Sequence, residues 1–474
     1  MSYETVVGLE VHLQLATKTK AFCGCPTAFG GEPNSHTCPV CLGFPGSLPV
    51  LNKEAFSFAV RVALALNCKI QDLIKFDRKN YYYPDLPKNF QISQYDMPLS
   101  YDGHVDIQPG GKTKRIRIKR VHLEEDAGKL MHEQGRSLVD YNRSGIPLLE
   151  IVTEPDINSP DEAYAYLTKL KSILKYLRVS DCDMEKGSLR CDANISLRPK
   201  GETKLGTKVE IKNMNSFKNV RSGLEFEVKR QLSALEDGEK IRQETRLWDA
   251  DKAVTDPMRS KEEAEDYRYF PEPDLVPFAV DKKDVEEARK ALPELPEAKC
   301  ARLVKDFGLS EYDAGVITSD ADMAEYFDEA CGLCANKKAV ANWLIGDITA
   351  YMNEKGVGAR ELGLRPSGLA ALLKMIELGS ISGKMAKEVL AEALETKAAP
   401  ADIVAKKGLA QISDAAKIEE VVRTVLAKNE KSANDYKSGK KNALAFLIGQ
   451  VMKETKGAAN PAVVNEILRK NLGG

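Results

Sequence analysis

The sequence predicts an α+β protein, in which a large cradle domain built on a mainly antiparallel β-sheet with flanking helices precedes an all-α domain and a small α-helical tail domain. Three segments of the first part alternate apolar and polar side chains, the period of a strand with one buried face. In the second part, Ala, Leu, Lys and Glu recur at helical spacing. With 474 residues, 43% hydrophobic and 29% charged, the chain is long enough for several soluble domains.

The boundary of the cradle domain is expected at residues 292–296, where two prolines exclude a continuous helix. The cradle domain then covers residues 1–293, and a helical domain covers residues 294–405. The helical period of the second domain is clearest in the apolar residues Leu369, Leu372, Leu373 and Ile376.

A tail domain is expected at residues 406–474, after a second break near Pro400. This segment has thirteen basic against seven acidic residues, a local charge of +6 in a chain whose net charge is -1. Such an asymmetry favours an interaction domain.

Three strands of the cradle domain are predicted from alternation. They run from Val7 to Leu15, from Leu189 to Arg198 and from Lys208 to Lys212, each with one apolar and one polar face. A polar face is compatible with ordinary solvent surface. Asp, Asn and His between basic residues are also found on functional concave faces, and the pattern alone gives both interpretations equal weight.

One helix of the cradle domain is predicted with a defined start. Ser159 is an N-cap, Pro160 occupies the first helical position and Glu162 the capping-box position. Apolar residues follow at helical period, namely Leu167, Leu170, Ile173, Leu174 and Leu177. We expect this helix to pack behind the sheet as scaffold.

Four cysteines form a specific metal-like pattern: Cys23 and Cys25, then Cys38 and Cys41 after twelve residues. Two close pairs can surround one tetrahedral Zn²⁺, and the intervening prolines and glycines favour a knuckle over residues 23–41. The alternative is four small thiols that merely pack. Four protein ligands leave no open position, so zinc at this knuckle would be structural.

Two segments carry carboxylates in patterns that could bind a metal. Glu10 and His12 share one face of the first strand, about 7 Å apart along it. Glu124, Glu125 and Asp126 follow a basic strand and precede a glycine. A solvated acidic turn is the expected interpretation of these three, and a Mg²⁺ site with hard oxygen ligands is the alternative.

The segment from Asp77 to Pro84 combines basic residues with three consecutive tyrosines. Such a combination is typical of sites that grip a phosphate and stack a base, although tyrosines on a half-buried strand explain it equally. Walker-type, dinucleotide-binding, protein-kinase and Gly-x-Ser-x-Gly signatures are absent from the sequence. If the protein binds ATP, residues outside these known signatures must therefore hold it.

Composition also limits the class of protein. A net charge of -1 provides no global field for nucleic acid. The sequence shows no secretory leader and no apolar stretch long enough for a membrane span, so we expect a cytoplasmic protein without membrane contact. In that compartment the ten cysteines are expected as free thiols and metal ligands.

Seven motifs in order along the chain are more specific than any spacing. They are Val7-Gly8-Leu9-Glu10-Val11-His12, Cys38-Pro39-Val40-Cys41-Leu42-Gly43, Phe76-Asp77-Arg78-Lys79-Asn80-Tyr81, His122-Leu123-Glu124-Glu125-Asp126-Ala127-Gly128-Lys129, Gly187-Ser188-Leu189-Arg190-Cys191-Asp192-Ala193-Asn194, Glu210-Ile211-Lys212-Asn213-Met214-Asn215-Ser216-Phe217 and Asp266-Tyr267-Arg268-Tyr269-Phe270-Pro271-Glu272-Pro273-Asp274. A tail block from Gly449 to Lys453 extends the match. With these motifs the chain resembles the GatB family, the B subunits of the aspartyl/glutamyl-tRNA(Asn/Gln) amidotransferase, over essentially its whole length.

The resemblance implies a tRNA-dependent amidation. Such a protein uses ATP and Mg²⁺ to phosphorylate the side-chain carboxylate of misacylated Glu-tRNA(Gln) or Asp-tRNA(Asn), and ammonia then displaces the phosphate. The ammonia comes through a channel from a glutaminase partner, the amidase or A subunit, and a small C subunit completes a heterotrimer. The cradle domain would hold ATP and the aminoacyl end, and the other domains the tRNA body. The resemblance applies equally to the formation of Gln-tRNA(Gln) and of Asn-tRNA(Asn).

The resemblance also implies roles for particular residues. The implied catalytic group is Glu10, His12, Lys79 and Glu125. The implied Mg²⁺ ligands are Glu10, His12, Glu124, Glu125 and Glu150. The residues implied to contact phosphate or carboxylate are Lys79, Arg190, Lys208 and Lys212. The residues implied to orient the nucleotide or the metal are Asp192, Asn194, Ser196 and Glu210.

Two further roles concern transport and tRNA. Lys79 and Glu125 are expected to line the ammonia route as a charged gate. The tail cations expected to attract the tRNA backbone are Lys437, Lys440, Lys441, Lys453 and Lys456.

Two other classes of protein share parts of this pattern. A zinc-stabilised RNA-binding protein without catalytic activity would need only the knuckle, the aromatic residues and the basic tail. The carboxylates from Glu124 to Asp126 argue against it, because a pure RNA binder has no use for three anions beside a basic strand. The archaeal relative specific for glutamine formation carries an inserted domain for which this chain has no room.

Overall fold

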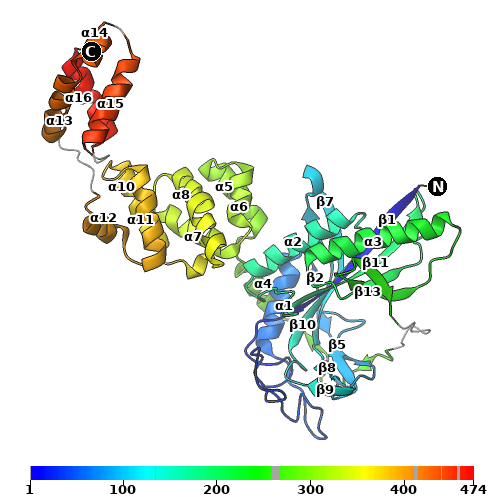
Figure 1. Ribbon diagram of the computed structural model, residues 1–474. Helices are drawn as coiled ribbons and strands as arrows, with labels where there is room; N and C mark the ends of the chain where they lie inside the picture. The colour runs from blue at the N-terminus through cyan, green and yellow to red at the C-terminus, as the bar shows by residue number, and fades with distance from the viewer. Residues whose placement is uncertain are drawn as a thin grey trace. The chain divides into compact units, whose positions relative to one another are not determined.

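The computed structural model describes residues 2–133, 135–258, 267–409, 415–438, 440–455 and 459–473. The chain divides into two compact units, Met1–Leu295 and Pro296–Gly474 (Figure 1). This division falls in the proline-containing stretch expected to end the cradle domain, whereas the further boundary at residue 405 stays a prediction. Among the described residues, no helix combines the length and the apolar character needed to cross a membrane.

A nine-stranded sheet organises the described part of the first unit (Figure 1). From edge to edge its strands are β14 (Val254–Pro257), β13 (Glu244–Asp249), β12 (Val209–Lys212), β11 (Leu189–Pro199), β1 (Tyr3–Gln14), β10 (Pro147–Thr153), β7 (Lys114–Glu125), β6 (Ser100–Ile107) and β2 (Lys69–Ile70). Neighbouring strands are antiparallel except β12 and β13, which are parallel. The predicted mainly antiparallel sheet is confirmed, and the three predicted strands are β1, β11 and β12.

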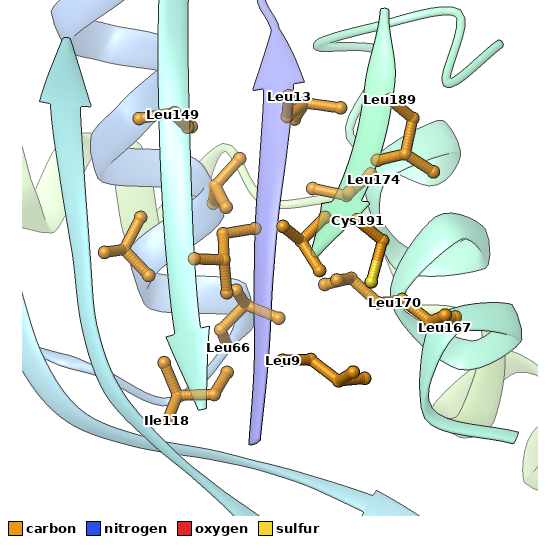
Figure 2. Close-up of a cluster of buried hydrophobic side chains, with 14 of the residues drawn as sticks. Leu9, Leu13, Leu66, Ile118, Leu149, Leu167, Leu170, Leu174, Leu189 and Cys191 are labelled. Atoms are coloured by element: carbon orange, nitrogen blue, oxygen red, sulfur yellow. The ribbon is translucent and has the colours of Figure 1, made fainter. Parts of the chain in front are cut away.

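Three helices cover one face of this sheet. They are α1 (Lys53–Ala65), α2 (Pro160–Tyr176) and α3 (Phe217–Glu236), with α4 (Lys282–Lys290) packed on α1. Leu9 and Leu13 of β1 are fully buried in the core between sheet and helices, in the same cluster as Leu170 of α2 (Figure 2). Each such side chain contributes about 1.5–3 kcal/mol when fully buried. The alternate residues of each strand are therefore left on the opposite, polar face of the sheet.

The start of α2 agrees with the sequence pattern. Ser159 has extended backbone angles, and its hydroxyl accepts a hydrogen bond of 3.2 Å from the Glu162 N–H. The Glu162 carboxylate accepts from the N–H of Asn158, one residue before the cap. An N-cap bond of this kind is worth about 1 kcal/mol.

Smaller sheets complete the first unit. Their strands are β15 (Phe270–Pro271), β4 (Asp77–Asn80) and β5 (Phe90–Ser93) in one sheet, β16 (Phe278–Ala279) with β3 (Leu73–Ile74), and β8 (Lys129–Glu133) with β9 (Arg136–Asp140). The three-stranded sheet lies against the end of β7, because the Ile92 N–H donates to the Glu125 carboxylate over 2.9 Å. It therefore brings its own polar residues to the end of the large sheet.

The second unit is helical throughout its described part. Its helices are α5 (Pro296–Phe307), α6 (Glu311–Thr318), α7 (Ala321–Leu333), α8 (Lys337–Trp343), α9 (Thr349–Lys355), α10 (Pro366–Glu377), α11 (Gly383–Thr396), α12 (Pro400–Lys407), α13 (Ala415–Lys428), α14 (Glu430–Lys437), α15 (Asn442–Glu454) and α16 (Pro461–Leu472). The predicted apolar period lies in α10, where Leu369, Leu372 and Leu373 are buried. The last four helices share their own core, which includes Val422, Leu447 and Leu468.

Candidate functional site

A row of ionisable side chains crosses the polar face of the large sheet. In the strand register, His12 of β1 stands opposite Glu150 of β10 and Arg190 of β11, and Glu150 stands opposite His122 of β7. Residues directly opposite each other in a sheet share one face. Segments more than a hundred residues apart in the sequence are thus brought into one site.

His12 and Glu150 of this row can share a cation with Glu124, which lies two residues after His122 on β7. The ligand atoms of His12, Glu124 and Glu150 all lie within 4.8 Å of one another. The His12 Nε2 atom is 3.6 Å from a Glu124 oxygen and 3.8 Å from a Glu150 oxygen. Behind them, His122 is buried with its Nε2 atom 3.2 Å from Glu150, and the Ser93 hydroxyl donates to Glu124 over 3.2 Å.

The expectation of a solvated acidic turn is wrong. Strand β7 continues through Glu125, and Glu124, Glu125 and Asp126 are only 2%, 3% and 4% exposed. Buried carboxylates need cations or hydrogen-bond donors nearby. Each of the three has such partners in the structure, and the partners differ because successive strand residues face opposite sides.

The charges of this row bias the protonation of its members. Burial acts to raise the pKa of Glu150, but its interactions with His122, His12 and Lys79 outweigh burial, and the pKa is lowered. Glu150 is therefore available as an anionic ligand. The pKa of Glu10 is raised, first by burial and then by the carboxylates of Glu150 and other neighbours.

Lys79 supplies a half-buried cation beside this row. Burial alone would lower its pKa, yet the charges of Glu124 and Glu150 raise it, so the ammonium form is retained. Its Nζ atom lies 4.9 Å from the centre of the Tyr267 ring and 5.9 Å from that of Tyr81. The predicted catalytic residues His12 and Lys79 are thus placed around the same carboxylates.

Arg190 is fixed at one end of the row by Asp126. The guanidinium donates to the Asp126 carboxylate over 2.9 Å, and the Gln14 amide donates to the same oxygen over 2.8 Å. Asp126 is buried, and despite that burial its pKa is lowered by Arg190 and Arg143. Arg190 is therefore held in one orientation on the polar face.

Further polar side chains continue across β11 and β12. The Lys212 ammonium lies 2.7 Å from Asp192 and 3.1 Å from Glu210. The Asn194 amide donates to Glu10 over 2.9 Å, which ties β11 to β1. This second group of charges lies beside the His12 row on the same face.

The other predicted phosphate-binding residues differ in exposure. Ser196 is buried two positions beyond Asn194 on β11. Lys208 is exposed immediately before β12. The Thr245 hydroxyl of β13 donates to Glu210 over 2.7 Å, a contact that sequence reasoning did not find.

Glu125 points to the opposite side of β7 from Glu124. Its carboxylate pairs with the Lys88 ammonium and accepts from the Ile92 N–H. It lines a cavity of about 270 Å³, whose described lining residues do not include Lys79. Glu125 does not join the group of His12, Glu124 and Glu150, and the shared role of Lys79 and Glu125 along the ammonia route stays a prediction.

The same cavity is bordered by the cysteine knuckle. The sulfur atoms of Cys23, Cys25, Cys38 and Cys41 lie within 4.8 Å of one another, which suits a tetrahedral metal with metal–sulfur distances of about 2.3 Å. The Cys23 thiol, the Cys38 N–H and the Lys20 ammonium lower the pKa of Cys41. These neighbours favour the thiolate form of Cys41, the form that binds metal.

Lys20 is the charged neighbour of the knuckle. It is 1% exposed, and its Nζ atom lies 3.7 Å from the Cys41 sulfur and 3.2 Å from the Tyr141 carbonyl oxygen. A metal held by four thiolates carries net negative charge, which the buried ammonium offsets. The donor set and its counter-charge fit a divalent metal.

Comparison with known proteins adds to this geometry. The family model described as the GatB/GatE catalytic domain matches residues 5–286, and the one described as the GatB domain matches residues 325–472. A protein of Thermoanaerobacter sp. strain X514, named as the B subunit of aspartyl/glutamyl-tRNA(Asn/Gln) amidotransferase, is 56% identical over 473 residues, with all of both chains covered. Proteins of the same name from Carboxydothermus hydrogenoformans and Brevibacillus brevis are each 55% identical, with 99% of both chains covered.

The chain belongs to the GatB family of amidotransferase subunits. The resemblance seen in the motifs is confirmed, and a catalytic-domain match over residues 5–286 favours the amidotransferase over an RNA binder without chemistry. The residues of the His12 row all fall inside that match.

The basic residues of this GatB chain's tail lie on its last helices and the connections between them. Lys437, Lys440, Lys441 and Lys453 are exposed, and Lys440 pairs with Asp435 at 3.0 Å. Lys456 lies outside the described residues. The exposed lysines are accessible to a polyanion, and their part in tRNA binding stays a prediction.

Sequence reasoning missed several residues that complete this GatB site. His122 and Asp126 lie inside a quoted motif, but only the register shows that they support Glu150 and Arg190. Lys20 and Lys88 are buried lysines that pair with groups elsewhere in the chain. No local spacing distinguishes such a lysine from the exposed ones around it.

Proposed function

We propose that this chain is the synthetic component of a tRNA-dependent amidotransferase, which converts misacylated Glu-tRNA(Gln), Asp-tRNA(Asn) or both to the amide. The observation that carries the proposal is the His12, Glu124 and Glu150 group with Lys79 and Arg190 beside it, inside the segment matched by the catalytic-domain model. Clustered carboxylates and half-buried cations on one polar face suit a reaction that gathers negative charge.

The chemistry requires activation of a carboxylate. A carboxylate oxygen of the substrate attacks the γ-phosphorus of ATP, the bond from that phosphorus to the bridging oxygen breaks, and ADP leaves. The nitrogen lone pair of ammonia then attacks the acyl carbon, inorganic phosphate leaves, and the nitrogen loses a proton. Both steps are helped mainly by positioning and by compensation of charge.

Side chains on the polar face of the large sheet would provide this positioning and this compensation of charge. His12, Glu124 and Glu150 would hold a divalent cation such as Mg²⁺, which neutralises phosphate charge when bound. Arg190 and Lys212 present cations to the phosphates of ATP, each fixed by a carboxylate neighbour. Lys79 offers an ammonium to the substrate carboxylate.

Remaining members of the polar face would orient the nucleotide. Asp192, Asn194, Ser196 and Glu210 surround this part of the sheet, and Lys208 lies at its rim. Glu10 has a raised pKa and accepts from Asn194, so we place it beside the metal group as a neighbour.

The opposite side of β7 would receive ammonia. The cavity lined by Glu125 and Lys88 is the candidate end of the route from a glutaminase partner, the amidase or A subunit. The four cysteines would hold a structural Zn²⁺ that fixes one wall of this cavity. A small C subunit would complete the complex, and the tail lysines would bind the tRNA backbone.

One experiment tests the function. The chain is purified with its two partners, Glu-tRNA(Gln) and Asp-tRNA(Asn) are supplied separately, and ATP-dependent amide formation is measured. Amidation of at least one substrate is expected, and its absence with both would refute the proposal. A Glu124→Gln variant is expected to bind Mn²⁺ at least tenfold more weakly by titration without ATP, whereas Glu377→Gln, an exposed control on α10, is not.

A further inference from the structure

An aromatic ladder lies next to the group of His12, Glu124 and Glu150, called the carboxylate row from here on, and none of the steps above uses the ladder. The aromatic ladder consists of Tyr83, Tyr81, Tyr267, Tyr269 and Tyr95 in spatial order. Successive ring centres are 6.3, 5.9, 6.0 and 4.4 Å apart. The first three contacts are edge-on, and the last pair is stacked with 10° between the ring planes.

The three-stranded sheet assembles this ladder from distant segments. Tyr81 follows β4, Tyr95 follows β5 shortly after its end, and Tyr267 and Tyr269 precede β15. Tyr83 and Tyr95, at the two ends, are 47% and 53% exposed, whereas the three middle rings are partly buried. A core cluster would bury the rings completely, so the ladder presents an aromatic surface to solvent.

Cations accompany the rings. The Lys79 ammonium lies over the rings of Tyr267 and Tyr81. Nearby, the Arg268 guanidinium lies 5.5 Å from the centre of the exposed Tyr82 ring. Rings and cations together are the groups that bind single-stranded nucleic acid, through base stacking and phosphate contacts.

The ladder reaches the carboxylate row itself. The Tyr81 hydroxyl donates to the Gln91 side chain over 2.9 Å, and the Gln91 amide donates to the backbone carbonyl of Glu125. On the same strand as Gln91, the Ser93 hydroxyl donates to the Glu124 carboxylate over 3.2 Å. The aromatic surface therefore lies beside the end of β7 that carries Glu124, where the proposed function places the reacting carboxylate.

We propose that the aromatic ladder stacks the unpaired 3′-terminal nucleotides of the aminoacyl-tRNA. This inference rests on the proposed function and names the subsite that positions its substrate. The aminoacyl ester is attached to the terminal ribose, so a base held on the ladder brings the amino acid to the row that contains His12. Several rings in series suit successive bases of a strand, whereas ATP offers a single base.

Stacking of this kind is tolerant of sequence, because every base has a π-face. The ladder would accept any tRNA that presents an unpaired 3′ end. Selection between tRNAs must then come from other parts of the complex.

The test uses the complete complex with Leu and Phe replacements at Tyr95 and Tyr267. Uncharged tRNA is titrated in two forms, intact and lacking its unpaired 3′ nucleotides. Wild-type complex should bind the truncated form on the order of tenfold more weakly. The Leu variants should bind both forms equally, the Phe variants should resemble wild type, and Tyr312→Leu, whose ring is 75% exposed on α6, is the matched control.

Steady-state kinetics distinguishes the other outcomes. We expect Tyr95→Leu and Tyr267→Leu to raise the KM for Glu-tRNA on the order of tenfold while the KM for ATP stays unchanged. A raised KM for ATP alone would assign the rings to the adenine of ATP and overturn the inference. Unchanged tRNA binding in a complex that still amidates would also overturn it, whereas a wild-type complex that does not amidate refutes the proposed function instead.

Stability of the variants is checked by thermal unfolding. Tyr95 is the more exposed of the two rings, so Tyr95→Leu decides the question if Tyr267→Leu does not fold.

Discussion

The ion pair between Lys88 and Glu125 should be worth a measurable amount of folding free energy. The two side chains are only 9% and 5% exposed. Replacing Lys88 by Met leaves the Glu125 carboxylate buried, and loss of one partner of a buried pair costs about 3–5 kcal/mol. The carboxylate keeps its hydrogen bond from Ile92, and the cavity of about 270 Å³ can admit water. We therefore expect a loss of about 2–3 kcal/mol, at or below the lower end of that range.

A double-mutant cycle isolates the pair. Glu125→Gln keeps an acceptor for the Ile92 N–H but removes the charge, so the double variant should cost less than the sum of the single changes. The expected coupling energy is about 2 kcal/mol.

Fluorescence can report on the first unit alone. The chain has two tryptophans, and in a Trp343→Phe background the buried Trp248 reports urea unfolding of the sheet unit. The midpoint should fall while the slope with urea is unchanged, because the surface exposed on unfolding is the same.

Two results would refute the reasoning. A coupling energy below about 0.5 kcal/mol would mean that the pair is effectively solvated. In the complete complex, unchanged glutamine-driven amidation by Glu125→Gln would show that the cavity is not part of the ammonia route.

Three further changes have defined outcomes. Cys41→Ser should release the metal, measured with a chromogenic chelator, and lower the unfolding midpoint, whereas Cys300→Ser on α5 should do neither. Glu10→Gln should stabilise the chain at pH 7 to 8 because the raised pKa makes ionisation of folded Glu10 unfavourable; the gain should vanish as pH falls towards 4.5, and a gain independent of pH would contradict this. Replacing Lys437, Lys440 and Lys441 by Gln should reduce the slope of log affinity for tRNA against log salt by about 2, and an unchanged slope would exclude them from the interface.

Three strands of the large sheet, helix α2 and the apolar face of α10 could be predicted because their signals are local. Alternation from Val7 onwards identifies β1, and Ser159 with Pro160 identifies the start of α2. The composition change near residue 293 likewise falls at the division between the two units. Each of these signals lies within a dozen residues of the feature it predicts.

The set of residues that forms the site could not be predicted, because strand pairing brings these residues together from distant parts of the sequence. The meeting of His12 with Glu150 and His122 is set by antiparallel register across three strands. The charge run at Glu124 was expected to face water, since exposed acidic runs are common, but strand pairing carries it into the interior. The aromatic ladder likewise joins rings nearly two hundred residues apart.

The alternation at the end of β7 has a consequence for transport. Glu124 belongs to the carboxylate row and Glu125 to the cavity beside the knuckle, yet their Cα atoms are only about 3.8 Å apart. The strand is thus a partition one backbone thick between two compartments. Under the proposed function, ammonia that reaches the cavity would be separated from the activated acyl group by this partition alone.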